Sequence, residues 1–186
     1  MKKVLILAAL GAALVAAPAL AQGKKMSIGS SELKANQPIP MAHVFAGFGC
    51  TGGNKSPALS WSNAPEGTKS FAVTMYDPDA PTGSGWWHWV VFNIPATVTK
   101  LAAGAGDTAA SAMPAGAIQS MTDFGKPGYG GPCPPEGAKP HRYIFTVYAL
   151  KIDKIPLDDK ASGALAGYYI KGNALASAAF TSTFGR

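Results

Sequence analysis

The sequence predicts a mainly β protein, a β-sandwich with a few short peripheral helices. Hydrophobic residues make up 47% of the 186 residues and charged residues 14%, which supplies a core for one domain and excludes an intrinsically disordered chain. The 22 Gly and 15 Pro interrupt helix interiors and exclude a helical bundle. Several segments also alternate apolar and polar side chains, which is the period of a β-strand.

Residues 1–21 are predicted to be a secretory signal peptide, cleaved after the small-residue site Ala19-Leu20-Ala21. Lys2 and Lys3 precede an apolar run over residues 4–15. An N-terminal anchoring helix is the alternative, but the apolar stretch barely reaches spanning length and ends in a processing site. Since no later segment approaches a transmembrane run, we expect a periplasmic or secreted protein with no integral membrane segment after cleavage.

The remainder, residues 22–186, is predicted to form a single domain because it contains no repeat, charge block or low-complexity linker. Without Lys2 and Lys3, fourteen basic residues stand against ten acidic ones, a net charge near +4 with the lysines spread singly. The lack of a basic stripe argues against a nucleic-acid partner. Residues 101–116 are nearly all Ala, Gly, Ser and Thr, which predicts a long surface loop.

Three strands of a core sheet are predicted from alternation and from β-branched and aromatic content. Phe71, Val73 and Met75 alternate with their neighbours, and residues 143–148 repeat the pattern. Residues 87–94 form a dense aromatic and β-branched run. Four shorter strands are predicted over residues 26–28, 58–62, 117–119 and 174–180. Together these strands favour a sandwich.

One helix is predicted, beginning near Asp158 or Ser162 and ending around residues 172–173. Its apolar positions are Leu165, Tyr168 and Tyr169. Their helical spacing indicates an amphipathic helix that packs on the sheet. We interpret the adjacent tyrosines as one core and one surface residue rather than as a ligand-binding pair.

Two segments carry chemistry that strand and turn design alone does not explain. The first runs from Asp77-Pro78-Asp79-Ala80-Pro81 to Gly85-Trp86-Trp87-His88-Trp89. Asp77 continues the two-residue spacing of the apolar residues before it, so its carboxylate should point to the same, core-facing side of the strand, at the rim. An unpaired charge is costly in that place. The tight turn that follows predicts a cis peptide bond between Ala80 and Pro81.

The second segment is a rigid Gly/Pro loop over residues 128–137, which leads into a strand where His141 and Tyr143 share one face. If the two segments meet, one shallow pocket gains the Asp77 carboxylate, two imidazoles and a phenol hydroxyl, enough donors to hold a phosphate-like anion. Protonated imidazoles would strengthen such binding near pH 6. Purely structural roles are the alternative: a turn cap for Asp77, a rim position for His88 and a carbonyl bond for His141.

The two cysteines, Cys50 and Cys133, are predicted to form a disulfide because export places them in an oxidising compartment. Two buried free thiols are the alternative, since sequence alone does not bring the two Cα atoms within bridging distance. A zinc site is disfavoured further, because two cysteines and three scattered histidines lack the short paired spacings of structural zinc sites.

At these segments the sequence resembles the phosphatidylethanolamine-binding protein family, also called Raf kinase inhibitor-like proteins, and especially its bacterial exported branch. The resemblance is carried by residues 77–81, by residues 86–88 and by the Gly/Pro loop ending in His141-Arg142-Tyr143. Ser56-Pro57-Ala58-Leu59-Ser60-Trp61 is similar to a third family landmark. The resemblance covers nearly all of residues 22–186 and implies a β-sandwich with a small anion pocket at one end, formed by the two motif loops.

The resemblance also implies which residues form that pocket. They are Asp77, Trp86, His88, His141 and Tyr143, with Pro134 and the backbone of Cys133 on the wall and Asp79 behind them. Eukaryotic relatives often have glycine at the position of Cys133, which favours a loop shaped by a disulfide here. The C-terminal segment matches the eukaryotic helix poorly, so no pocket residue carries over from it. The family's kinase-binding role does not follow for an exported protein.

The predicted function is non-enzymatic binding of phosphate-like anions or phospholipid head groups, with regulation of another, unidentified protein as a further expectation. The alternative is a hydrolase that uses the Asp/His pocket on a phosphorylated or ester substrate. The sequence lacks a Gly-x-Ser-x-Gly elbow, an HExxH motif and a P-loop lysine, so such an enzyme needs water or a metal ion as nucleophile or activator. A secreted inhibitor is a third class, suggested by family analogy alone. No cofactor, metal or catalytic residue is expected.

Overall fold

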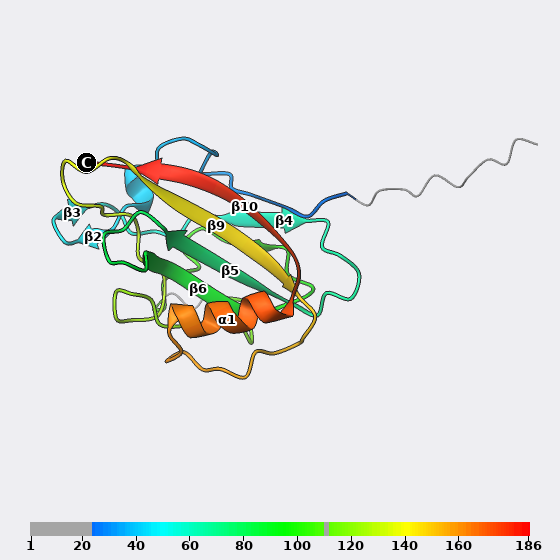
Figure 1. The fold of residues 1–186 in the computed structure, drawn as a ribbon. Helices are drawn as coiled ribbons and strands as arrows, with labels where there is room; N and C mark the ends of the chain where they lie inside the picture. The colour runs from blue at the N-terminus through cyan, green and yellow to red at the C-terminus, as the bar shows by residue number, and fades with distance from the viewer. Residues whose placement is uncertain (1–23, 110–111) are drawn as a thin grey trace, which may run out of the picture.

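The computed structural model describes residues 24–109 and 112–186, and its central feature is a five-stranded antiparallel sheet (Figure 1). The strand order is β10-β9-β5-β6-β8. These strands are β5 (Ser70–Asp77), β6 (Trp86–Pro95), β8 (Ile118–Gln119), β9 (His141–Leu150) and β10 (Ala174–Phe184). The three long strands predicted for the core sheet are therefore confirmed. The predicted signal peptide, residues 1–21, lies outside the described residues.

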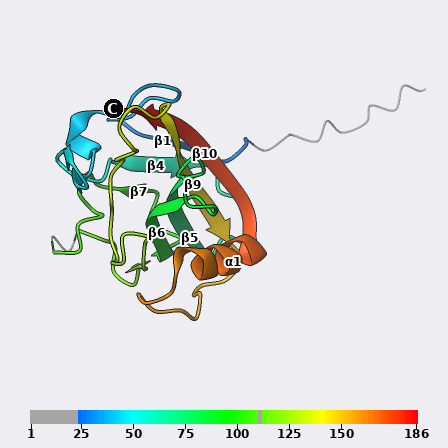
Figure 2. The same cartoon turned by 60° about the vertical axis from the view of Figure 1, so that its left-hand side comes forward.

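A smaller sheet packs against one face of the large one and completes the predicted sandwich (Figure 2). It contains β1 (Ser27–Gly29), β4 (Leu59–Ser62) and β7 (Lys100–Leu101). Side chains at alternate positions of the long strands, such as Val73, Phe145 and Trp89, meet Leu59 and Trp61 in the core between the sheets. Every second side chain of these strands points into the space between the two sheets, and its burial there is the physical basis of the sandwich.

Two short elements flank the sheets near His141, the first residue of β9. They are the 3₁₀ turn Met41–His43 and the hairpin of β2 (Ala46–Gly47) with β3 (Cys50–Thr51). The sequence pattern did not predict them, because two- and three-residue elements are too short to show periodicity. Within the described ranges, no helix is both long enough and apolar enough to cross a membrane.

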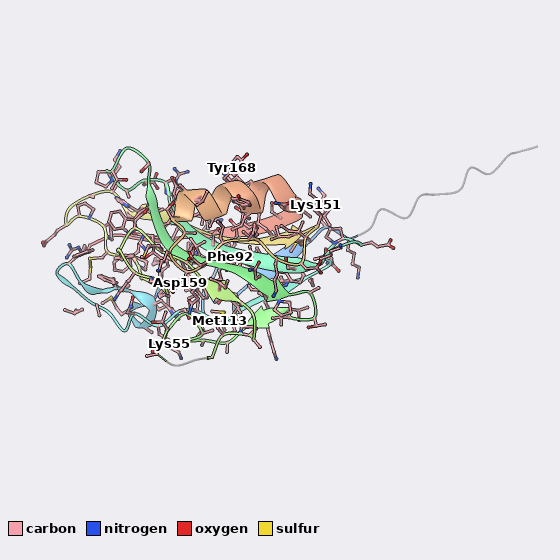
Figure 3. The ribbon with its side chains drawn as sticks, turned by 90° about the horizontal axis from the view of Figure 1, so that it is seen from below. Lys55, Phe92, Met113, Lys151, Asp159 and Tyr168 are labelled. Carbon is pink, nitrogen blue, oxygen red and sulfur yellow. A yellow bond between two sulfur atoms is a disulfide. The ribbon has the colours of Figure 1, made fainter. Side chains whose placement is uncertain are left out.

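The helix α1 (Gly163–Asn173) covers the other face of the large sheet. Its limits agree with the prediction, and the Ser162 hydroxyl accepts a hydrogen bond from the Leu165 amide as an N-cap. The predicted apolar face is wrong, however. The buried positions are Gly163, Ala166, Gly167 and Ile170, whereas Leu165 is 44% exposed and Tyr168 76% exposed. Figure 3 shows Tyr168 on the side of the helix away from Phe92.

The small residues of α1 explain why its buried face differs from the predicted one. A Cβ atom added at Gly163 would collide with the Trp87 side chain, so the glycine surface is what lets the helix approach the sheet. Close approach buries Ala166 and Ile170 fully, while Tyr169 is only partly buried. The interpretation of the tyrosine pair as one core and one surface residue is therefore confirmed.

The prediction of a surface loop over residues 101–116 is wrong at its beginning. Leu101 pairs with Leu59 in the smaller sheet and is buried, and Ala105 is fully buried in the same core. The Gly106 amide donates to the Ser56 hydroxyl over 2.8 Å. A chain of small residues can pack this closely against its neighbours, so low complexity here indicates close approach rather than exposure.

Candidate functional site

The end of β5 and the starts of β6 and β9 lie together at one end of the large sheet, where they border a cavity of about 230 Å³. Because β5 and β6 are antiparallel, Asp77 at the end of β5 lies opposite Trp86 at the start of β6. β9 begins at the same end of the sheet, with His141. The cavity is lined by Phe48, Asp77, Ala80, Pro81, Thr82, Trp86, His88, Phe124, Cys133, Pro134, Pro135, His141 and Tyr143. All seven predicted pocket residues belong to this set.

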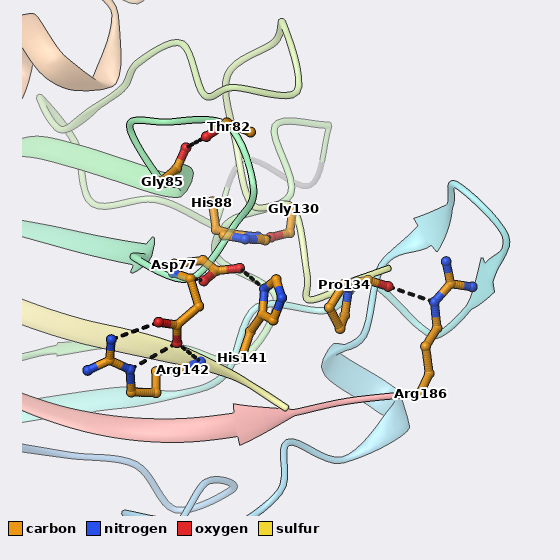
Figure 4. Close-up of polar contacts among 10 residues, drawn as sticks. Asp77, Thr82, Gly85, His88, Gly130, Pro134, His141, Arg142 and Arg186 are labelled. Carbon is orange, nitrogen blue, oxygen red and sulfur yellow. Dashed lines mark hydrogen bonds and ion pairs between the residues drawn. The ribbon is translucent and has the colours of Figure 1, made fainter. Parts of the chain in front are cut away.

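Asp77 is buried and fully partnered. Its Oδ2 accepts a hydrogen bond from His141 Nδ1 over 2.8 Å, and its Oδ1 accepts one from the Asp79 amide over 2.8 Å (Figure 4). The side chains of His141 and Asp77 are 8% and 4% exposed. Since a carboxylate only accepts, His141 Nδ1 carries a proton and Nε2 is the ring nitrogen left for a ligand. Asp77 thus caps its turn and orients an imidazole at once.

His88 is also held through its Nδ1, but by a backbone carbonyl instead of a carboxylate. Its Nδ1 donates to the Gly130 carbonyl over 2.7 Å, so its Nε2 is an acceptor. Burial lowers the pKa of His88 to about 4, because desolvation disfavours the imidazolium more than the carbonyl of Gly130 favours it. The expectation that both imidazoles become charged near pH 6 is therefore wrong for His88.

Two donor atoms of residues that line the cavity have no hydrogen-bond partner within the described part of the chain. They are Trp86 Nε1 and Tyr143 Oη, both of which are inaccessible to solvent as atoms. Burial, followed by the charge of Asp77, raises the pKa of Tyr143 far above its ordinary range, so its phenol remains a neutral donor. Buried polar atoms are nearly always paired, so two unpaired donors on residues that line one cavity are an unusual feature of this site.

Asp79 lies behind the cavity and ties its turn to β9. Its carboxylate accepts from Arg142 Nε over 2.9 Å, from Arg142 Nη2 over 2.7 Å and from the Arg142 amide over 2.9 Å. The side-chain hydrogen bonds of Arg142 lower the pKa of Asp79 to about 2. Two bonds in a planar fork fix the turn's position relative to the strand that carries His141.

The predicted cis bond between Ala80 and Pro81 is wrong: the bond is trans, as are all others in the described residues. Hydrogen bonds fold the turn instead. The Thr82 amide donates to the Ala80 carbonyl over 2.8 Å, and the Thr82 hydroxyl donates to the Gly85 carbonyl over 2.5 Å. With the Asp77 cap, these contacts reverse the chain without an isomerised proline.

The predicted disulfide is confirmed. Cys50 and Cys133 are bonded, with their Cα atoms 6.0 Å apart, and neither cysteine is free. The alternatives of two free thiols or a zinc site are thereby excluded for these residues. Cys133 lines the cavity, so the bond connects the β2–β3 hairpin directly to the pocket wall.

The match to a known family rests on most of the chain. Residues 29–185 fit the family model described as phosphatidylethanolamine-binding protein. The chain belongs to this family. It is 56% identical over 164 residues to the UPF0098 protein YbcL of Escherichia coli, covering 88% of this chain and 90% of that protein. It is 53% identical over 159 residues to YbhB of the same organism, covering 86% and 99%.

Solved structures of the phosphatidylethanolamine-binding protein (PEBP) family show the same fold. The crystal structure of Escherichia coli YbcL, described as a new member of the mammalian PEBP family, superimposes with a TM-score of 0.86 at 55% identity, covering 88% of this chain and 99% of that one. A PEBP homologue from Chlamydia trachomatis gives a TM-score of 0.72 at 30% identity, covering 87% and 98%. Family membership supports a binding protein as the broad functional class.

The aromatic rim of this PEBP pocket is built around Phe48 and Phe124, neither of which was predicted as a site residue. Their rings are stacked with centroids 5.9 Å apart, and Phe124 also meets Trp86 and His88 edge-on at 5.4 and 5.3 Å. Phe48 is 68% exposed. Its place between two glycines beside Cys50 was a usable signal, because an apolar residue in so flexible a loop has little reason to be buried. Phe124 carried no such signal.

Burial of neutral His88 predicts an acid-sensitive fold. The unfolded chain takes up a proton on His88 below pH 6.5 and the folded protein does not until about pH 4, so acidification over this window favours unfolding. We expect this group to remove about 3 kcal/mol of stability between those pH values. Urea unfolding at stepped pH measures it. In H88N, whose amide can still donate to Gly130, that part of the slope should vanish, and equal slopes in both proteins would contradict the prediction.

Proposed function

We propose that this pocket binds phosphate-like anions, including phospholipid head groups, and that the protein acts as a binding protein rather than a hydrolase. The observation that carries the proposal is the pair of buried, unpartnered donors, Trp86 Nε1 and Tyr143 Oη, on the same cavity as His141. Two unpartnered donors on residues that line one small cavity suit an anion with several oxygens. Membership of the phosphatidylethanolamine-binding protein family supports the same class of ligand.

The charge arrangement suits a phosphate that retains one proton. Both oxygens of Asp77 are already occupied by the Asp79 amide and His141, so the carboxylate is shielded from an incoming anion. His88 Nε2 is an acceptor and suits the P–OH of a monohydrogen phosphate. A few charge-assisted bonds in a pocket open to water correspond to roughly 4 to 8 kcal/mol, which is millimolar to micromolar affinity.

Two side chains at this cavity that could act as nucleophiles, Thr82 and Cys133, are engaged elsewhere. The Thr82 hydroxyl donates to the Gly85 carbonyl, and the Cys133 sulfur is in the disulfide. Neither has a neighbouring base among its hydrogen-bond partners, which nucleophilic catalysis requires. These contacts favour binding over covalent hydrolysis in our proposal.

Export remains part of the proposal. The sequence of residues 1–21 is typical of a secretory signal, and a disulfide persists in the oxidising compartment to which such a signal leads. We propose that the protein works in the periplasm or outside the cell. Fractionation of cells that produce the full chain tests this, and recovery of the uncleaved protein in the cytosol would contradict it.

Calorimetric titration with inorganic phosphate and with phosphoethanolamine tests the binding proposal. We expect Y143F to weaken both ligands by about 10- to 100-fold, because a hydrogen bond to a charged group contributes roughly 1.5–3 kcal/mol. Y148F is the matched control, since Tyr148 lies on the same strand and packs on the opposite face of the sheet. Unchanged affinity in Y143F, or no binding by the unmodified protein, would refute the proposal.

A hydrolase assay on p-nitrophenyl phosphate and p-nitrophenyl acetate distinguishes the alternative. We expect no release of nitrophenol above that of heat-unfolded protein. Turnover by the native protein that disappears in H141Q would establish the hydrolase instead, because contaminating enzymes do not respond to a pocket substitution.

A further inference from the structure

Arg186, which follows β10, joins two segments of the pocket wall from behind. Its Nε donates to the Pro134 carbonyl over 2.8 Å, a contact visible in Figure 4, and its Nη2 donates to the Phe48 carbonyl over 3.2 Å. The Gly137 amide donates to the Arg186 carbonyl over 2.9 Å. Phe48 and Pro134 line the cavity, whereas Arg186 does not. The guanidinium therefore acts on the pocket only through the residues that it holds.

The Phe48 segment depends on contacts from outside itself. Phe48 has a φ of 53°, a left-handed conformation that is uncommon for a residue with a side chain, and its ring is 68% exposed. Neither local backbone preference nor burial holds the ring over the cavity. The ring contacts Phe45 and Phe124, and two cross-links hold the backbone of this segment: the Cys50–Cys133 disulfide and the Arg186 guanidinium. The planar fork of arginine can reach two carbonyls at once, which a single ammonium cannot do in the same geometry.

The cavity has a polar floor and an apolar rim. The polar atoms belong to Trp86, His88, His141 and Tyr143, and the rim is made by Phe48, Phe124, Pro81, Pro134 and Pro135. A phosphate ion has four oxygens, and a cavity holds one water in roughly 15 Å³, so a phosphate takes about 60 Å³ by the same measure. The cavity measures about 230 Å³, so a bound phosphate leaves room against the rim for one small attached group. A flat apolar group complements aromatic and proline side chains.

We propose that Arg186 is a specificity-determining positioning residue: by holding the Phe48 and Pro134 carbonyls it fixes an apolar wall that makes the pocket prefer phosphate monoesters with a flat apolar group to inorganic phosphate. This inference rests on the proposed function and extends it to a class of ligand. The floor selects the phosphate, and the wall selects what is attached to it.

Titrations with inorganic phosphate and phenyl phosphate test the proposal on the full-length protein, R186Q and R186K. We expect the unmodified protein to bind phenyl phosphate about 10-fold more tightly than phosphate. Both variants should lose most of this preference, while their affinity for inorganic phosphate changes by less than about threefold. K171Q, which removes a charge from α1, should behave like the unmodified protein.

A second variant shows whether Arg186 acts through the wall. F48A removes an exposed ring, so it should fold normally and lose the same preference. In the double variant R186Q/F48A we expect no further loss, because both changes remove one interaction. Additive losses would overturn the proposal, as would full preference in R186K, which would reduce Arg186 to a charge effect.

The outcomes separate this inference from the function on which it rests. Binding of phosphate without any preference for phenyl phosphate, or a preference that survives in both Arg186 variants, overturns the inference and leaves the anion site standing. If the unmodified protein binds neither ligand, the proposed function fails and the inference fails with it.

Discussion

Replacing Cys133 with serine is expected to lower the free energy of unfolding by up to about 4 to 5 kcal/mol, because the lost disulfide closes a loop between residues that are 83 apart in sequence. This value is the loss expected from chain entropy alone, and strain and residual structure in the unfolded state usually reduce it. Urea unfolding measured under identical oxidising conditions gives the difference. A loss of less than about 1 kcal/mol would contradict the prediction.

The same substitution should weaken phosphate binding, because Cys133 is part of the pocket wall. I170A is the matched control: Ile170 on α1 is fully buried between the helix and the large sheet and does not line the cavity, and its truncation costs about 2–5 kcal/mol. We expect I170A to lower stability and leave phosphate affinity unchanged, whereas C133S changes both. Thiol titration of the denatured, unreduced protein checks the premise, and two reactive thiols there would remove it.

H141Q is expected to have the largest effect on ligand binding, a loss of about 100-fold in affinity for phosphate. The substitution removes an imidazole from the cavity and also deprives the buried Asp77 carboxylate of the side chain that donates to it over 2.8 Å. A carboxylate without that partner repels an anion in a poorly solvated site. H43Q is the control, because His43 is also buried and hydrogen-bonded through Nδ1, in its case to the Lys55 carbonyl, and it does not line the cavity.

Sulfate separates the protein's contribution to the pH dependence from the ligand's, because sulfate remains a dianion from pH 5.5 to 8. His88 stays neutral over this range, because burial lowers its pKa to about 4. We therefore expect H88N and the unmodified protein to show the same pH dependence of sulfate affinity. A pH dependence that is lost in H88N alone would show that His88 takes up a proton in this range and would contradict the prediction.

Much of the fold could be predicted because strands and helix ends are encoded by residues close in sequence. The alternation of Phe71, Val73 and Met75 reports one buried face of β5, whatever packs against it. Ser162 marks the start of α1 because its hydroxyl bonds an amide three residues away. The pocket residues lie at strand ends with unusual chemistry, and the antiparallel sheet brings those ends together.

The features that sequence did not reveal depend on partners distant in the chain. Which face of α1 is buried follows from Trp87, against which only the glycine surface fits. His88 is neutral because packing removes water from an imidazole that could otherwise be charged. The aromatic rim brings together Phe48 and Phe124. Arg186 donates to the Phe48 carbonyl although the two residues are 138 apart in sequence. Periodicity and caps are local properties, whereas desolvation, close packing and long-range hydrogen bonds exist only after the sheets have assembled, so tertiary structure alone decided the electrostatics and the shape of this pocket.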